Sequence, residues 1–206
     1  MAKQSKPFPL RAITVRMRRA YFDCKFGQLH VRTAFPTTGG FDEQVTLLCL
    51  HSREGSSSTF AKFLPEIADV RSVYAPDLPG FGESDPAPSP GFADAARAIL
   101  DLVKELRLRQ LDLLGLRFGA AVALDLAAAR PDLVRRLVLQ GSPPMDRIPV
   151  VKQPCLVLRV RGDPQDHAQW SRGALPNARF AEIGAADGFD ADPKGLARQI
   201  GAFLKE

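Results

Sequence analysis

The sequence has few cysteines, and their arrangement points to neither metal binding nor disulfide chemistry. Its 206 residues contain three cysteines, an odd number without a Cys-x-x-Cys pair, which argues against a disulfide framework and against a zinc or redox motif. Cys24, Cys49 and Cys155 each lie in a stretch that is typical of a β-strand. The histidines and aspartates also lack metal-ligand spacing. We therefore expect three reduced, buried thiols, no metal site and no cofactor.

Long hydrophobic runs are missing too. No apolar run approaches the ~20 residues that a membrane-spanning helix needs, and the first residues lack the apolar middle region of a secretion signal. With 45% hydrophobic and 25% charged residues, the composition is that of an ordinary globular protein. We expect a cytoplasmic protein with no membrane span, whose length fits one domain.

The first 22 residues contain no acidic residue. Six of the 28 basic residues lie here, which leaves 22 basic against 23 acidic residues in the rest of the chain. The six are Lys3, Lys6, Arg11, Arg16, Arg18 and Arg19. We predict a basic, solvated extension over residues 1–18 and a single domain over residues 19–206, with nucleic acid not expected as a partner.

The hydrophobic pattern predicts an α/β fold. Apolar and polar residues alternate on both sides of Gly27, which predicts an N-terminal antiparallel hairpin. Continuous apolar runs, typical of strands buried on both faces, occupy residues 45–50, 72–75, 111–114, 137–139 and 155–160. Segments with helical spacing occupy residues 60–69, 92–106, 120–130 and 193–204. Because strands and helices alternate, we expect a mostly parallel sheet.

The connection between the last two of these strands is short. Residues 143–154 are near the minimum length for a crossover between parallel strands. They contain four prolines, which leave little room for a helix: Pro143, Pro144, Pro149 and Pro154. We expect an extended loop here.

The segment L-D-L-L-G-L-R-F-G at residues 111–119 has the frame of a nucleophile elbow. Gly115 and Gly119 flank Arg117 as the two glycines of G-x-S-x-G flank a serine on a sharp strand-to-helix turn. A guanidinium has five donors and no acceptor, and it keeps its proton at physiological pH. Arg117 therefore cannot be the nucleophile.

Four motifs together resemble the α/β-hydrolase superfamily from about residue 22 onward. They are L-L-C-L-H-S at residues 47–52, A-P-D-L-P-G-F-G-E-S-D at residues 75–85, the elbow frame, and A-A-A-R-P-D-L-V-R-R-L-V-L at residues 127–139. The resemblance implies a three-layer α/β-hydrolase-like fold. Because family members usually carry a lid after the sixth strand, and residues 143–154 hold only a loop there, it also implies a lidless member.

The departures from the family concern its catalytic residues. The nucleophile position maps to Arg117 and the histidine position to Asp187, while Asp163 or Asp166 stands at the acid position. Ser52 replaces the glycine that usually follows His51. The resemblance therefore implies a degenerate triad, and whether the protein is an enzyme stays open.

Three hypotheses for the site remain. Arg117, Phe118, His51 and Ser52 could bind a small anion at the start of a helix. Arg117 could instead form a structural salt-bridge cluster with Asp187 and one of the two other aspartates. In the third, His51 or His167 acts as the base of an unorthodox enzyme.

The histidines have simpler interpretations as well. We expect His30 to be a half-exposed strand residue and His167 to lie in solvent. His51 comes at the end of a strand, where open α/β sheets bind ligands, and capping of the loop by a hydrogen bond is an equal alternative.

We predict an α/β-hydrolase-fold protein that has lost serine-hydrolase activity and whose residual cleft binds a small anionic molecule or is vestigial. One alternative is a hydrolase or lyase for a small ester or carbonyl compound with a non-standard set of residues. The other is a non-catalytic scaffold that binds a protein partner at the lidless face.

Overall fold

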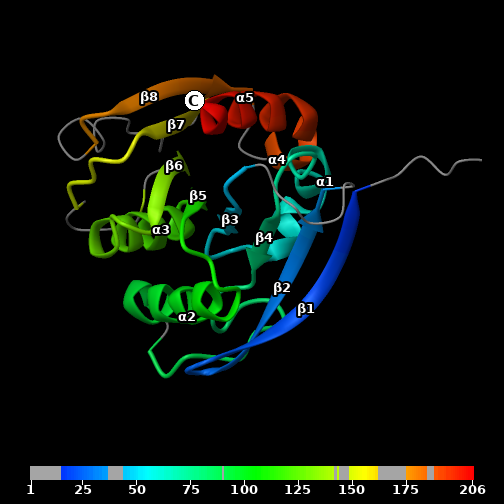
Figure 1. Ribbon diagram of the computed structural model, residues 1–206, viewed down its shortest axis with the longest axis vertical. Coiled ribbons are helices and arrows are strands. Elements are labelled where there is room, and N and C mark those ends of the chain that lie inside the picture. Colours follow the sequence, from blue (N-terminus) through cyan, green and yellow to red (C-terminus); the bar gives the residue numbers. More distant parts are fainter. Residues whose placement is uncertain are drawn as a thin grey trace, which may run out of the picture.

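The computed structural model describes residues 15–36, 44–89, 91–141, 143, 149–161, 175–184 and 188–206. Eight strands form one sheet in the order β1-β2-β4-β3-β5-β6-β7-β8 (Figure 1). They are β1 (Arg16–Cys24), β2 (Gly27–Phe35), β3 (Leu47–Leu50), β4 (Val73–Pro76), β5 (Leu111–Leu116), β6 (Val134–Gln140), β7 (Cys155–Val160) and β8 (Ala178–Ile183). β2 pairs antiparallel with β1 and β4, and the other neighbours are parallel. The predicted hairpin and mostly parallel sheet are confirmed.

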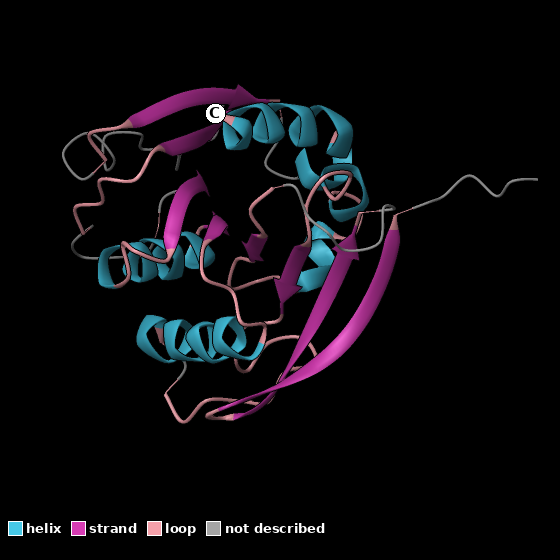
Figure 2. Cartoon of the chain, viewed as in Figure 1, coloured by secondary structure: helices cyan, strands magenta, loops and turns pink. Residues whose placement is uncertain are grey.

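Helices cover both faces of the sheet (Figures 1 and 2). Helices α2 (Phe92–Glu105) and α3 (Phe118–Ala129) lie on one face. Helices α1 (Leu64–Ile67), α4 (Gly188–Ala191) and α5 (Pro193–Lys205) lie on the other. These are the three layers expected of an α/β-hydrolase-like fold. None of the helices in the described part of the chain has both the length and the apolar character of a membrane-spanning segment.

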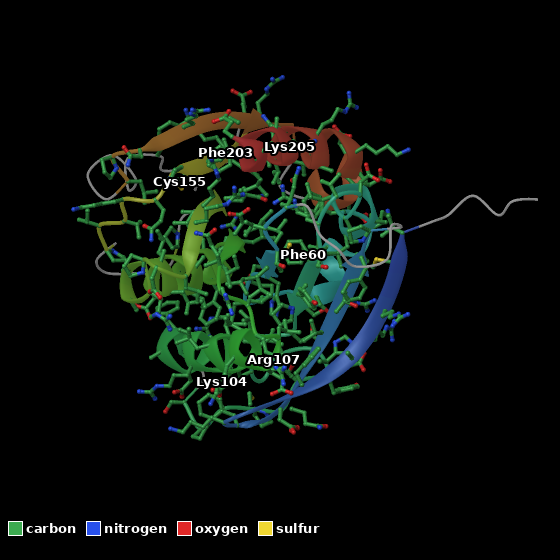
Figure 3. The ribbon with its side chains drawn as sticks, in the orientation of Figure 1. Phe60, Lys104, Arg107, Cys155, Phe203 and Lys205 are labelled. Carbon is green, nitrogen blue, oxygen red and sulfur yellow. The ribbon has the colours of Figure 1, made fainter. Side chains whose placement is uncertain are left out.

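The sheet has a hydrophobic core on each face, and the continuous apolar strands contribute side chains to both cores. Leu48 and Leu113 pack toward α2 and α3, whereas their neighbours Leu47 and Leu114 pack toward α1 and α5. Successive side chains of a strand point to opposite faces, so a strand between two helical layers must be apolar at every position. Phe60 illustrates the second core: it lies in the interior, with its ring centroid 5.4 Å from that of Phe189 (Figure 3).

The helix predicted over residues 60–69 is wrong as a single element. The structure has a 3-10 turn, η1 (Ser57–Phe60), followed by the one-turn helix α1. Ser56 caps η1, because its Oγ accepts the N–H of Ser58 at 3.2 Å. Pro65 stands at the start of α1, where its missing N–H costs no helical hydrogen bond. The local capping groups therefore divide the segment.

Three other elements differ from the expectations. β1 begins at Arg16, so it includes residues that the sequence pattern assigned to the N-terminal extension. β6 extends beyond the three residues of its apolar run. β8 has no such run, because it is an edge strand whose residues are mostly exposed or half-buried. The described part of the loop between β6 and β7, residues 143 and 149–154, forms neither helix nor strand.

A buried ion cluster joins the N-terminal ends of several strands. Asp112 on β5 is fully buried and accepts two hydrogen bonds from Arg135, from Nε at 2.9 Å and from Nη2 at 2.6 Å. Arg71, only 1% exposed, donates to the same carboxylate at 3.2 Å. Arg135 also donates to the carbonyl of Leu204 at 2.7 Å. The cluster thus ties the C-terminal turn of α5 to the sheet.

Candidate functional site

The turn between β5 and α3 is sharp and strained. Arg117 has φ 47° and ψ −98° and is the N-cap of α3. A side chain at positive φ crowds the backbone, so a residue other than glycine adopts it only where its surroundings hold it there. One such constraint is the N–H of Arg117, which donates to the carbonyl of Gln140 on β6 at 2.8 Å. The backbone therefore has the strand-to-helix geometry of a nucleophile elbow.

The two flanking glycines are required by close packing. A Cβ on Gly115 would lie 2.5 Å from the carbonyl oxygen of Gly119 and 2.7 Å from Ala120. A Cβ on Gly119 would lie 2.2 Å from the carbonyl oxygen of Leu50. Only glycine lets α3 approach both β5 and the end of β3 this closely. The Gly-x-x-x-Gly spacing in the sequence is thus explained by backbone contact, whatever residue stands between.

The side chain of Arg117 extends over the end of β6. A Cβ on Gly141 would lie 2.9 Å from Arg117 Cγ and 3.6 Å from its Nε. Gly141 also has φ +72°, a conformation that favours glycine. Arg117 is half-buried. No local sequence pattern marks Gly141 as part of this site, because its contact with Arg117 is made across neighbouring strands.

His51 caps the loop after β3. It is fully buried, its Nδ1 lies 2.6 Å from the carbonyl oxygen of Ser52, and its Nε2 accepts the N–H of Leu78 at 2.9 Å. Nδ1 therefore carries the proton and both ring nitrogens are used. Burial lowers the pKa of His51, since desolvation disfavours the charged ring. Of the two alternatives for His51, the structure supports the loop cap.

Phe118 and Ser52 make contacts within the protein: the ring of Phe118 packs against other side chains, and the carbonyl of Ser52 accepts hydrogen bonds. The Phe118 ring is only 2% exposed and packs against Phe92, at 5.0 Å between centroids, and against Phe81, at 6.2 Å. The guanidinium carbon of Arg53 lies 4.4 Å from the centre of the same ring. The carbonyl of Ser52 accepts the N–H of Gly55 at 3.0 Å as well as the His51 ring. Arg53 belongs to no sequence motif, so its contact with Phe118 could not be predicted from the sequence.

The prediction that His30 is half-exposed is wrong. His30 is 1% exposed, and its Nδ1 lies 2.8 Å from Oδ2 of Asp77, which is 2% exposed. Burial opposes the charge of Asp77, but hydrogen bonds from the N–H groups of Glu83 and Ser57 outweigh it and lower the pKa of Asp77. Asp77, in the loop after β4, and Tyr21 on β1, whose ring centroid lies 5.4 Å away, contact the His30 ring, and alternation along one strand could not reveal these contacts.

The other predicted site residues lie outside the described residues. These are Asp163, Asp166, His167 and Asp187. The salt-bridge cluster with Arg117 and the assignments to the histidine and acid positions therefore stay predictions. Within the part of the chain that the structure describes, no group of histidine, cysteine and acidic residues could hold a metal ion.

The surface hollows among the described residues include four whose linings contain neither Arg117 nor His51. The one nearest in sequence to the His51 loop has a volume of about 460 Å³ and includes Glu54, Ser56 and Phe189 in its lining. It lies beside the candidate site rather than in it.

Comparison with known proteins gives consistent results. Residues 45–194 match the family model of the α/β hydrolase fold. A 2-hydroxymuconate semialdehyde hydrolase of Pseudomonas sp. (strain CF600) is 39% identical over 104 residues, which cover 47% of this chain and 36% of that protein. A haloalkane dehalogenase of Bradyrhizobium diazoefficiens is 30% identical over 177 residues, 82% of this chain and 55% of that protein. The chain thus spans about half or less of the length of these curated relatives.

Solved structures agree on the fold. The epoxide hydrolase CorEH superposes with a TM-score of 0.80 at 13% identity, over 92% of this chain and 99% of that chain. A protein from Thermoplasma acidophilum described as a predicted CIB-like hydrolase gives a TM-score of 0.80 at 16% identity, over 93% of this chain and 99% of that chain. At such low identity these similarities concern the arrangement of the strands and helices.

Proposed function

Because this chain belongs to the α/β-hydrolase fold family, we propose that it keeps the frame of a hydrolase site without the serine-hydrolase reaction and binds a small anion beside Arg117. The observation that carries this proposal is the guanidinium-bearing residue at the strained N-cap of α3, between glycines that the packing requires.

Hydrolysis of the family type needs a nucleophile and a base that removes its proton. Arg117 supplies neither, and both nitrogens of His51 are engaged with the backbone of Ser52 and Leu78. Oxyanion donors and binding alone leave roughly 10³ to 10⁴-fold catalysis over water when triad members are removed. Such a rate would not sustain a hydrolase.

Anion binding follows from the helix end and the nearby cations. The first N–H groups of the 12-residue helix α3 have no partners within the helix, and the helix dipole favours negative charge there. Arg117 has five donors in a planar fork, enough to bind a carboxylate or phosphate while keeping other contacts. Arg53, stacked on Phe118, adds a second positive charge near the same helix end. We infer a carboxylate or phosphate ligand.

Two alternative functions are possible for this fold, a non-standard enzyme and a protein-binding scaffold. A non-standard hydrolase or lyase would fit the names of the relatives, but His51 cannot supply its base in this arrangement. A protein partner at the lidless face would fit the exposure of Val150, 63%, in the loop before β7. Neither has support as direct as the guanidinium at the helix end.

Ligand-induced thermal stabilisation tests the anion site. We expect acetate and inorganic phosphate to raise the melting temperature of the wild type, by about 3–6 °C at a concentration ten times the dissociation constant. Arg117→Ala should lose this shift. Arg107→Ala is the matched control, because Arg107 is the other described arginine at positive φ, and it should keep the shift. Equal shifts in all three proteins would refute the role of Arg117.

Loss of hydrolysis is tested separately. Incubation with a fluorophosphonate probe and a panel of p-nitrophenyl esters should give no labelling and no turnover above that of Arg117→Ala. Robust labelling of the wild type would contradict the loss of serine-hydrolase activity without deciding the anion site.

A further inference from the structure

Strand β8 forms an open edge of the sheet in the described residues. It is the last strand in the order and pairs with β7 on one side (Figures 1 and 2). An open edge carries backbone N–H and C=O groups that can pair with another strand.

The hydrogen bonds to β7 show which backbone groups face outward. Cys155 donates its N–H to the carbonyl of Asn177 at 3.4 Å, and Arg161 donates to the carbonyl of Ile183 at 3.0 Å. The odd-numbered residues of β8 therefore direct their backbone N–H and C=O groups toward β7. Because these groups alternate sides along a strand, Ala178, Phe180 and Glu182 direct theirs toward the open edge.

Phe180, at the centre of the open edge, has an exposed aromatic ring. Phe180 is 48% exposed, although large apolar side chains are usually buried. It has two charged neighbours on the strand, Arg179 and Glu182. The open edge thus presents an apolar centre with one charge of each sign beside it.

We propose that β8 pairs antiparallel with β8 of a second copy of this chain. A two-fold axis perpendicular to the sheet makes such an interface self-complementary. The register that uses all three outward residues places Phe180 opposite Phe180 of the second copy, and Ala178 opposite Glu182. Each of these pairs is then hydrogen-bonded in both directions, and the two exposed rings become cross-strand neighbours.

The charges fit this register. Glu182 lies opposite alanine, as does Arg179, whose partner across the interface is Ala181, so like charges are not directly opposed. Arg179 also has its own counter-ion, because its Nη1 lies 2.8 and 2.6 Å from the two carboxylate oxygens of Glu206. The two Arg179 side chains, diagonal across the axis, each carry a carboxylate with them.

The opposite edge of the sheet is less suited to self-pairing. β1 carries exposed Arg18 and Arg19 in its N-terminal half. Two copies joined there would bring four arginines into one ladder, a charge arrangement that discourages edge-to-edge pairing. The second copy is therefore assigned to β8.

Sedimentation of the full chain over about 1 to 100 µM tests the dimer. We expect a concentration-dependent dimer whose dissociation constant rises at least about tenfold in Phe180→Lys. Met17→Lys, at a 39% exposed position on β1, should leave the constant unchanged. A monomeric wild type, or a dimer weakened by Met17→Lys and not by Phe180→Lys, would overturn the proposal. Circular dichroism verifies that each variant is folded.

A cross-link tests the register. Opposed residues in a hydrogen-bonded antiparallel pair have Cα atoms about 5.5 Å apart, within the range of about 4.4–6.8 Å for disulfides. Phe180→Cys should therefore give a covalent dimer on mild oxidation. Glu182→Cys, whose equivalent in the second copy is four residues away along the ladder, should not. Equal cross-linking of the two variants would contradict the register, and no cross-linking of Phe180→Cys would contradict the interface.

Discussion

The ring of His51 joins the loop after β3 to the loop after β4, because its Nε2 accepts the backbone N–H of Leu78 at 2.9 Å. The same ring packs edge-on against Phe81, with centroids 5.5 Å apart. A histidine at the end of a parallel strand is an obvious candidate for catalysis. Here both of its ring nitrogens contact backbone groups, of Ser52 and Leu78.

The stability of the protein should depend on pH through His51. Because burial lowers its pKa, the unfolded chain binds a proton at His51 more readily than the folded chain. The stabilisation is complete above the unfolded pKa of about 6.5 and is lost as the pH falls through the lower pKa of the folded state. We expect the free energy of unfolding, from urea titrations, to fall below about pH 6.5 with a shallower slope in His51→Gln. Equal slopes would show that His51 does not titrate in this way.

Replacement of Gly119 should destabilise the protein strongly. In Gly119→Ala the new Cβ would meet the carbonyl oxygen of Leu50 at 2.2 Å, so the backbone of α3 must shift, at a cost of about 3 kcal/mol. Gly201→Ala is the control, because its Cβ would lie 3.5 Å from Cδ1 of Ile67, an ordinary contact. That variant should gain about 0.5–1 kcal/mol from helix propensity. Chemical denaturation of both variants measures the difference, and a tolerated Gly119→Ala would mean that α3 is less tightly held.

The end of α2 has a glycine-type cap without glycine. Arg107 and Lys104 lie at this end of the helix (Figure 3). Arg107 has φ 54°, its N–H donates to the carbonyl of Lys104 at 3.0 Å, and the N–H of Leu108 donates to the carbonyl of Val103 at 3.0 Å. This is the Schellman pattern, which favours glycine at the position of Arg107. We expect Arg107→Gly to stabilise the protein by about 1 kcal/mol, or about 2–4 °C in a thermal melt.

A nearby arginine provides the control for that measurement. Arg109 is also exposed but does not have positive φ. Arg109→Gly should therefore give no stabilisation. If both glycine variants lower the melting temperature, backbone strain at Arg107 is not the dominant effect.

Removal of Asp112 should be costly. Asp112→Ala leaves Arg71, which is 1% exposed, without the carboxylate that balances its charge, and such a change typically costs about 3–5 kcal/mol. Asp132→Ala removes a comparable but exposed ion pair, with Arg130 at 2.7 Å, and should barely change the melting temperature. Similar losses in the two variants would contradict the importance of burial.

Much of the fold could be predicted because the information is local. The runs over residues 45–50 and 155–160 are apolar at successive positions, whereas a strand with one exposed face alternates apolar and polar residues. They therefore indicate a sheet covered on both faces. The hairpin around Gly27 and the glycines around Arg117 are similarly explicit. β8 was not predicted, because an edge strand needs no apolar run. The helix predicted over residues 60–69 is divided by capping groups, which hydrophobic periodicity does not reveal.

The position of the candidate site in the fold could be predicted from the sequence, but the contacts between its residues could not. The elbow frame located Arg117 at the start of α3, whereas Gly141, Arg53 and the His30–Asp77 pair belong to the site region only through the folded arrangement. His51 shows the difference most clearly. Its partner Leu78 is 27 residues away along the chain, and no local pattern says which backbone group a histidine will meet.

The sequence by itself determined the fold family, the mostly parallel sheet and the pair of glycines that flank Arg117. These depend on residue types and on periodicities within a few neighbours. The tertiary structure decided that His51 is a cap, that His30 is buried against Asp77 and that β8 presents an open edge with Phe180 at its centre. Such properties depend on which strands become neighbours, because burial and hydrogen-bond partners are set by segments that are distant in the chain.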